Sequence, residues 1–261
     1  MRSGRGSLAR LGAWRPLVFV LALVPHAIGC DVTETGNPPL AAKMALTSHS
    51  SDATAIAIAP ATGPRFTVDA AWVVIGDIRF VRAAVCDLPG ETEIDVPGPV
   101  VRDLAPAPFP IDFTIAGDDY CRVRVPIIRA QMSLPAGAPP ELLDASVVVL
   151  GRRADGRTML VRSRRMLEVD TRSRGAPFSL REAEPAVLLS FDVARWLAGV
   201  DIDAAAVGGD GRVVVDDSQN RAQLDAFEAN VEAAVGLYRD RDLDSRLDAD
   251  ELFSPLASGG P

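Results

Sequence analysis

The sequence predicts a mainly β protein: a β-sandwich with a small α-helical C-terminal extension. Three observations lead to this fold class. Segments between about residues 43 and 190 alternate apolar with polar residues, as half-buried strands do, and proline-rich stretches such as "LAPAPFP" and "LPAGAPPEL" separate them. After Pro185 the apolar residues recur with the spacing of helices. A hydrophobic content of 48% over 261 residues is enough to form a buried core.

The first 29 residues have the layout of a secretory signal peptide. "MRSGRGSLARLGAWR" is basic and lacks acidic residues, "PLVFVLALV" is a short apolar run, and "PHAIGC" ends in small residues before Cys30. The apolar run is shorter than the roughly 20 residues that a membrane-spanning helix needs. An ordinary buried N-terminal element is the alternative, but it fits badly with the arginines ahead of the run. We therefore expect residues 1–29 to direct export.

The residues around Cys30 resemble two features of bacterial lipoproteins. "AIGC", Ala27 to Cys30, resembles the lipobox, in which the cysteine is lipidated and becomes the new N-terminus. "DVTETGNPPLAAK" resembles the tether of Gram-negative lipoproteins that carry Thr-Glu-Thr-Gly-Asn-Pro after the cysteine, and its polar, glycine- and proline-containing composition is unsuited to packing. We assign residues 30–42 to this tether. The resemblance implies a lipid anchor at Cys30 and a place in the cell envelope, at the outer membrane or the periplasmic face of the inner membrane.

The sandwich is assigned to residues 43–190. "TAIAIAP" and "AAWVVIGDIRFVRAAV" predict strands, the second with Ile78 and Phe80 on one face, and "CRVRV" alternates in the same way. "SVVVLGRRADGRTMLVRS" predicts a hairpin with Asp155-Gly156 in its turn, because glycine supplies a positive φ. The order of strands resembles an uncharacterised β-sandwich domain of bacterial lipoproteins.

Residues 191–253 are assigned to the helical extension. Asp192 is suited to cap a short helix that ends at Gly199. "SQNRAQLDAFEANVEAAVGLY" predicts a longer amphipathic helix. Its apolar stripe consists of Leu224, Phe227, Val231, Val235 and Tyr238. Residues 254–261 are assigned to a disordered tail.

The acidic stretch "DRDLDSRLDADE", Asp240 to Glu251, directly follows this predicted helix and resembles the calcium loop of the EF-hand family. The implied ligands are Asp240, Asp242, Asp244, the backbone carbonyl of Arg246, Asp248 directly or through water, and a bidentate Glu251. Leu247 fits as the apolar residue that holds the loop to the core, whereas Ser245 stands where the sharp turn normally has glycine. A solvated acidic turn balanced by neighbouring arginines is the alternative. Calcium is plentiful outside the cell, so even a weak single site would fill.

Two cysteines remain if Cys30 carries lipid. Outside the cytoplasm an even pair predicts a disulfide, here between Cys86 and Cys121, which we expect to join two strands. Two unpaired buried thiols are the alternative. A metal bound by this pair is disfavoured, because the chain beyond the signal peptide offers only His49 as a nitrogen ligand.

Composition and motifs favour a binding or structural role over catalysis. The net charge of −8 becomes more negative when the arginine-bearing N-terminus is removed, so the chain is a poor candidate for binding nucleic acid. His49 lies in the polar stretch "TSHSSD", and we interpret it as a surface residue, which leaves little for a Ser-His-Asp or Cys-His mechanism.

We therefore expect a non-enzymatic module at the cell envelope, with a structural calcium ion and an envelope protein or glycan as its partner. A calcium-dependent envelope hydrolase that uses carboxylates is the alternative. Paired acids such as Asp201 and Asp203 would need a cleft with aromatic platforms, and aromatic residues make up only 5% of the chain.

Overall fold

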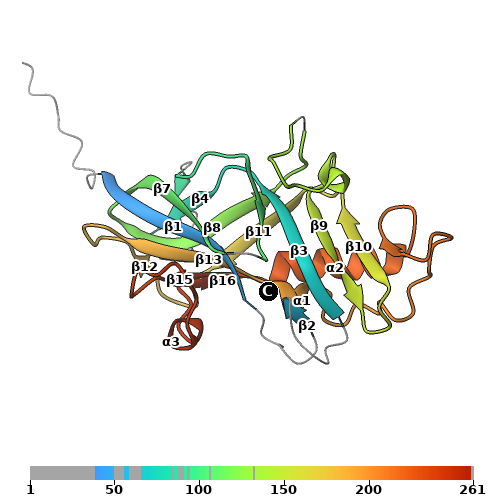
Figure 1. Ribbon diagram of the computed structural model, residues 1–261. Helices are drawn as coiled ribbons and strands as arrows, with labels where there is room; N and C mark the ends of the chain where they lie inside the picture. Colours follow the sequence, from blue (N-terminus) through green and yellow to red (C-terminus); the bar gives the residue numbers. More distant parts are fainter. Residues whose placement is uncertain are drawn as a thin grey trace, which may run out of the picture. The chain divides into compact units, whose positions relative to one another are not determined.

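The computed structural model describes residues 39–49, 56–58, 66–83, 85–87, 91–92, 95–105, 107–131 and 133–259. Within these residues the fold is mainly β, as predicted, with three short to medium α-helices (Figure 1). The predicted signal peptide, Cys30 and the tether as far as residue 38 lie outside the described residues. Among the helices of the described residues, none has the length and apolar character needed to span a membrane.

The described elements follow one another along the chain in a fixed order. The strands are β1 (Pro39–His49), β2 (Ile56–Ile58), β3 (Phe66–Ile75), β4 (Arg79–Arg82), β5 (Glu91–Thr92), β6 (Val100–Asp103), β7 (Phe109–Ala116), β8 (Asp119–Ile127), β9 (Val147–Arg153), β10 (Thr158–Ser163), β11 (Leu167–Arg172), β12 (Phe178–Ser179), β13 (Ala186–Asp192), β14 (Val213–Val215), β15 (Val235–Arg239) and β16 (Ala257–Ser258). The helices are η1 (Pro140–Leu142, a 3-10 turn), α1 (Val193–Leu197), α2 (Arg221–Ala233) and α3 (Ala249–Leu252).

The described strands form one hydrogen-bonded sheet, whose main path runs β14-β10-β9-β3-β8-β11-β16-β15-β13-β1-β7. The path has two parts, one from β14 to β11 and one from β15 to β7, and β16 lies between them. Ser258 of β16 pairs with Arg172 of β11 and with Gly236 of β15. A strand of two residues therefore joins the two parts of the sheet.

The inward faces of both parts contribute to one hydrophobic core. The predicted alternation is confirmed where it was clearest: Ile78 and Phe80 are buried, as are Val123 and Val125 of β8. The hairpin between β9 and β10 is confirmed as well, and Gly156 in its turn has a φ of +84°. Residues of the two parts meet in this core, as the predicted sandwich requires.

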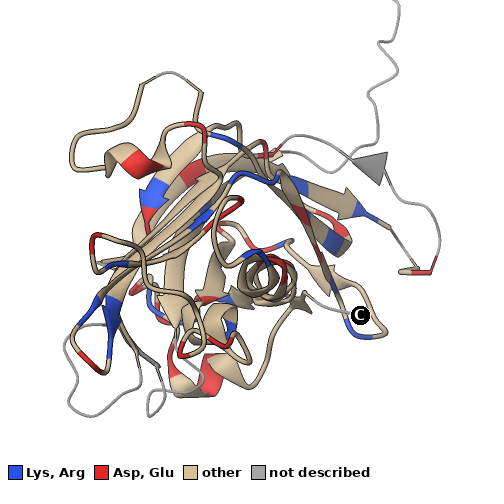
Figure 2. Cartoon of the chain, turned by 90° about the vertical axis from the view of Figure 1, so that its right-hand side faces the viewer, with Lys and Arg blue, Asp and Glu red and all other residues tan. Residues whose placement is uncertain are grey.

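Helices α1 and α2 complete the core. Asp192 caps α1, because its side chain accepts a hydrogen bond from the Arg195 N–H at 3.1 Å. The Trp196 ring then packs edge-on between Phe191 and Phe227, with both pairs of ring centroids 6.1 Å apart. In Figure 2, which looks along α2, strands lie on both sides of this helix, and α2 contacts β10, β11 and β14.

The predicted helix "SQNRAQLDAFEANVEAAVGLY" is too long at its C-terminal end. The helix ends at Ala233, and residues 235–239 form β15 instead of continuing it. Gly236 is a poor helix former. Pairing with β13 on one side and β16 on the other gives the backbone N–H and C=O groups of β15 hydrogen-bond partners. Val235 and Tyr238, which were predicted on the helix stripe, therefore belong to the sheet.

Two other predicted boundaries also need correction. The first strand begins at Pro39, so residues 39–42 of the predicted tether belong to β1, where they pair with β7. Proline is tolerated at this first position of a strand. In the predicted tail, residues 257–258 form β16, and Ala257 is buried between the two parts of the sheet.

The disulfide between Cys86 and Cys121 is confirmed, with 5.1 Å between the Cα atoms. Cys121 is buried in β8, whereas Cys86 lies in the turn after β4. The bond therefore fastens a turn to a strand, and the expectation that it joins two strands is wrong for Cys86.

Candidate metal centre

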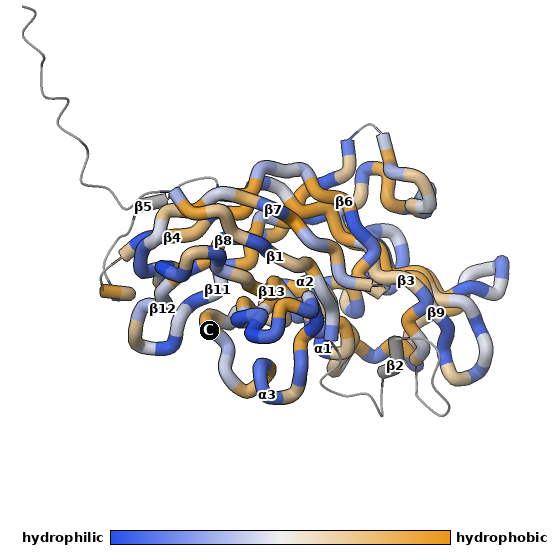
Figure 3. Tube along the Cα trace, turned by 60° about the vertical axis from the view of Figure 1, so that its left-hand side comes forward, coloured by the Kyte–Doolittle hydropathy of each residue, from blue (hydrophilic) through white to orange (hydrophobic). Residues whose placement is uncertain are grey.

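The acidic loop lies between β15 and α3. Pairing of β15 with β13 fixes its start, because the Asp240 N–H donates to the Ala186 carbonyl at 3.1 Å. Figure 3 shows the contrast in hydropathy between the hydrophilic segment around α3 and the hydrophobic β13. Leu247 packs against the small cluster of Ala45, Leu188 and Tyr238, so its predicted role in holding the loop to the core is confirmed.

Three of the predicted ligands come together in this loop. Carboxylate oxygens of Asp240, Asp242 and Asp244 lie within 4.8 Å of one another. Hydrogen bonds from the loop backbone hold the arrangement: the Asp244 N–H donates to Asp242 at 3.3 Å, and the Ser245 N–H donates to Asp240 at 3.1 Å. Carboxylates this close repel one another unless a cation or proton lies between them.

Asp240 is the buried member of the group. Its residue is only 7% exposed, and its Oδ1 atom is buried without a hydrogen-bond partner among the described residues. Burial raises the pKa of Asp240, and the charges of Glu251 and Asp242 raise it further, against hydrogen bonds from the Ser245 and Leu243 backbone. A buried carboxylate oxygen without a partner costs stability, and a bound cation would offset that cost.

Glu251 approaches the loop from α3 and is 3% exposed. Its Oε1 accepts a hydrogen bond from the Arg241 N–H at 2.7 Å, and its Oε2 accepts one from the Asp248 N–H at 3.3 Å. The second bond belongs to a capping box at the start of α3. Both oxygens are thus engaged by backbone groups, and Glu251 does not join the close group of three aspartates.

The remaining two predicted ligands lie on the exposed side of the loop. Arg246 is exposed, and its N–H donates to Asp244 at 2.7 Å, while Asp248 is exposed at the start of α3. Ser245 has a φ of +66°, so the position where an EF-hand has glycine does adopt the left-handed conformation.

One part of the EF-hand resemblance is wrong. The loop follows strand β15 and not a helix, because the helix has already ended at Ala233. The likeness is therefore confined to the loop and the short helix after it.

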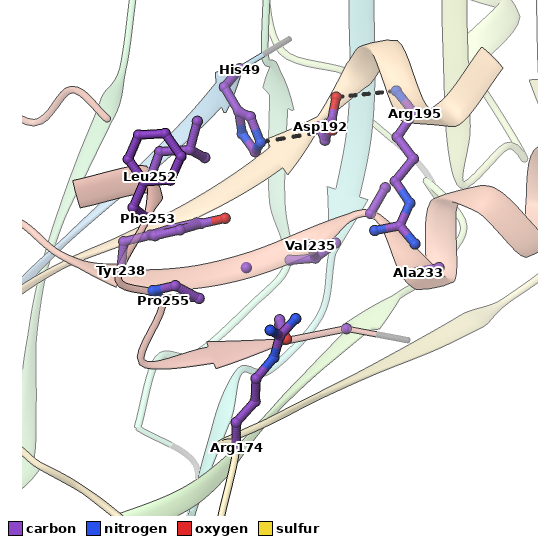
Figure 4. Close-up of a pocket in the computed structure, with 14 residues that line it drawn as sticks. His49, Arg174, Asp192, Arg195, Ala233, Val235, Tyr238, Leu252, Phe253 and Pro255 are labelled. Carbon is purple, nitrogen blue, oxygen red and sulfur yellow. Dashed lines mark hydrogen bonds and ion pairs between the residues drawn. The ribbon is translucent and has the colours of Figure 1, made fainter. Parts of the chain in front are cut away.

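His49 was predicted to be a surface residue, and this is wrong. It ends β1, its side chain is 15% exposed, and it faces a cavity together with Asp192 and Tyr238 (Figure 4). Its Nδ1 atom is hydrogen-bonded to Ser190 Oγ at 2.8 Å, and its Nε2 lies 3.9 Å from Asp192. Burial lowers the pKa of His49, against the opposing charge of Asp192. Pairing of β1 with β13 creates this contact, and the sequence around His49 carries no signal for it.

The group of Ser190, His49 and Asp192 lacks the accessibility of a hydrolytic triad. Ser190 is fully buried within β13, so its hydroxyl cannot meet a substrate. The contact between His49 and Ser190 instead fastens β1 to β13.

Comparisons with known proteins give one structural match. No protein-family model matches the sequence, and a search of curated proteins found no match. The chain is similar to the solved structure of MbnP from Methylosinus trichosporium, with a TM-score of 0.37 and 12% identity, over 68% of this chain and 83% of that chain.

Proposed function

We propose that this protein is a lipid-anchored module of the bacterial cell envelope whose loop from Asp240 to Glu251 binds a structural calcium ion. Its role is to bind an envelope protein or glycan or to support envelope structure, without catalysis. The lipid is attached at Cys30, and the ion holds α3 and the loop against the sheet.

The observation that carries the calcium proposal is the buried Oδ1 of Asp240, which lies beside Asp242 and Asp244 and has no hydrogen-bond partner among the described residues. Calcium prefers several oxygen ligands, and this loop provides carboxylates together with the backbone carbonyl of Arg246. Glu251 would have to exchange its bonds to backbone N–H groups for the ion. That exchange, with the positive φ of Ser245, fits a weak site with a Kd on the order of 10⁻⁴ to 10⁻³ M.

Thermal unfolding with and without calcium tests this proposal. At about 10 mM calcium a site of that affinity stabilises the folded state by about 1.4 to 2.7 kcal/mol, which raises the melting temperature by about 3 to 10 °C. We expect this rise in the full chain after removal of bound metal with a chelator. Sodium chloride at equal ionic strength controls for screening.

Matched variants separate the metal site from general charge effects. Asp240→Asn and Glu251→Gln should abolish the rise. Asp250→Asn should keep it, because the Asp250 side chain is 73% exposed and lies 3.9 Å from Arg241, outside the proposed ligand set. An equal calcium response in all three variants would show that calcium acts elsewhere on the chain.

Metabolic labelling with a fatty-acid analogue tests the anchor. The wild-type protein should be labelled and Cys30→Ser should not. Unlabelled wild-type protein that retains Met1 would contradict both the signal peptide and the lipid anchor.

A further inference from the structure

A cavity of about 410 Å³ lies among β13, β15, α3 and the segment after β11 (Figure 4). This volume is in the range of small-molecule sites. The lining combines polar groups on one side with apolar side chains on the other, which is the usual composition of such sites. None of its lining residues is a proposed calcium ligand.

Two arginines line the cavity. Arg195 belongs to α1 and Arg174 follows β11, and Figure 4 shows both side chains reaching toward β15. Neither guanidinium group makes an ion pair or hydrogen bond with a residue that the structure describes. Most of the other described arginines do form an ion pair with a carboxylate. Their positive charges are therefore available to a ligand.

The one carboxylate in the lining, Asp192, is already engaged. It caps α1 through the Arg195 N–H at 3.1 Å and lies 3.9 Å from His49 Nε2. The lowered pKa of His49 leaves that imidazole uncharged at neutral pH. The two guanidinium groups thus outweigh the single negative charge of the cavity.

The opposite side of the cavity is apolar. Phe253 is 83% exposed, which is unusual for so large an aromatic side chain, and it lies beside Leu252 and Pro255. The Tyr238 ring lies over Gly236: a Cβ atom at Gly236 would come within 2.7 Å of the tyrosine hydroxyl. In Figure 4 this hydroxyl extends along β15, where it is placed to donate to a ligand.

We propose that this cavity binds a small organic anion. Its carboxylate or phosphate group lies between Arg174 and Arg195, because the planar fork of a guanidinium group matches such oxygens with two parallel hydrogen bonds. Its apolar body lies against Phe253 and Pro255. Calcium is not needed for this proposal, since the two sites use different side chains.

Titration calorimetry with the full chain tests the proposal, using benzoate and phenyl phosphate as probes. Saturable binding of either is expected, and the tighter of the two identifies the oxyanion group. Arg174→Gln and Arg195→Gln should each weaken binding at least about tenfold, the loss expected for one charged hydrogen-bond pair. Arg172→Gln is the matched control, because Arg172 pairs with Asp170 at 2.9 Å outside the cavity.

Three outcomes would overturn the proposal. The first is the absence of saturable binding of both probes up to about 10 mM. The second is equal affinity in Arg174→Gln, Arg195→Gln and the wild type, with unchanged melting temperatures to confirm that the variants are folded. The third is binding of benzyl alcohol or inorganic phosphate as tight as that of the probes, since either result would remove the need for both an oxyanion and an apolar body.

Discussion

Removal of the disulfide between Cys86 and Cys121 should lower the free energy of unfolding by about 4 kcal/mol. The bond closes a loop with a sequence separation of 35 residues. In the loop-entropy model, a loop of that length lowers the entropy of the unfolded chain by about 13 cal/mol/K, which is about 4 kcal/mol at 25 °C. Cys121 is buried, so replacement by alanine avoids placing a new polar group in the core.

Urea unfolding of the Cys86→Ala, Cys121→Ala double variant measures this effect. The denaturant midpoint should fall, and the m-value should rise because the unfolded chain is less constrained. A reducing agent should bring the wild type close to the double variant and leave the double variant unchanged, which makes the variant its own control. A loss of stability below about 1 kcal/mol would refute the reasoning from chain entropy.

Three further predictions concern the sheet and the cavity. Ala257→Asp should lower the free energy of unfolding by several kcal/mol, because it places an unpaired charge at a buried position of β16. Urea unfolding measures this loss, and an unaltered denaturant midpoint would contradict the joining role of that strand. The pKa of His49 in the folded chain lies below its ordinary value of 6.5, so near that pH the unfolded chain binds more protons than the folded chain. The free energy of unfolding should therefore fall as the pH drops through about 6.5. His49→Gln should reduce this pH dependence. Gly236→Ala should lower the free energy of unfolding, measured thermally, by about 1 to 3 kcal/mol, because its Cβ would meet the Tyr238 ring at 2.7 Å. Ala234→Gly is the control that separates this clash from a general effect of substitution in the segment.

Alternation of residues made the most regular strands predictable. "CRVRV" and the segment with Ile78 and Phe80 bury alternate side chains, and the Asp155-Gly156 turn has local chemistry that specifies a hairpin. The cap at Asp192 was also predictable from local sequence. An aspartate before a helix accepts a hydrogen bond from a backbone N–H only three residues away.

Features that depend on distant pairing were not predictable. Val231, Val235 and Tyr238 keep helical spacing, yet residues 235–239 become a strand because β13 and β16 flank them. The pairing of β1 with β13 likewise determines the neighbours of His49, whose partner residues on β13 lie more than 140 positions away in the sequence. The spacing correctly predicted that Asp240, Asp242 and Asp244 come together, but the predicted incoming helix was wrong, since a strand end can present Asp240 as well as a helix end can.

The position of β13 has a consequence for the order of folding. This strand is buried along its whole length between β1 and β15, one near the start of the described chain and the other near its end. About fifty more residues must be synthesised after "AVLLSF" before its second neighbour, β15, is present. Until then this segment is a hydrophobic strand with an unpaired edge. Such long-range pairing slows folding and favours aggregation of the nascent chain.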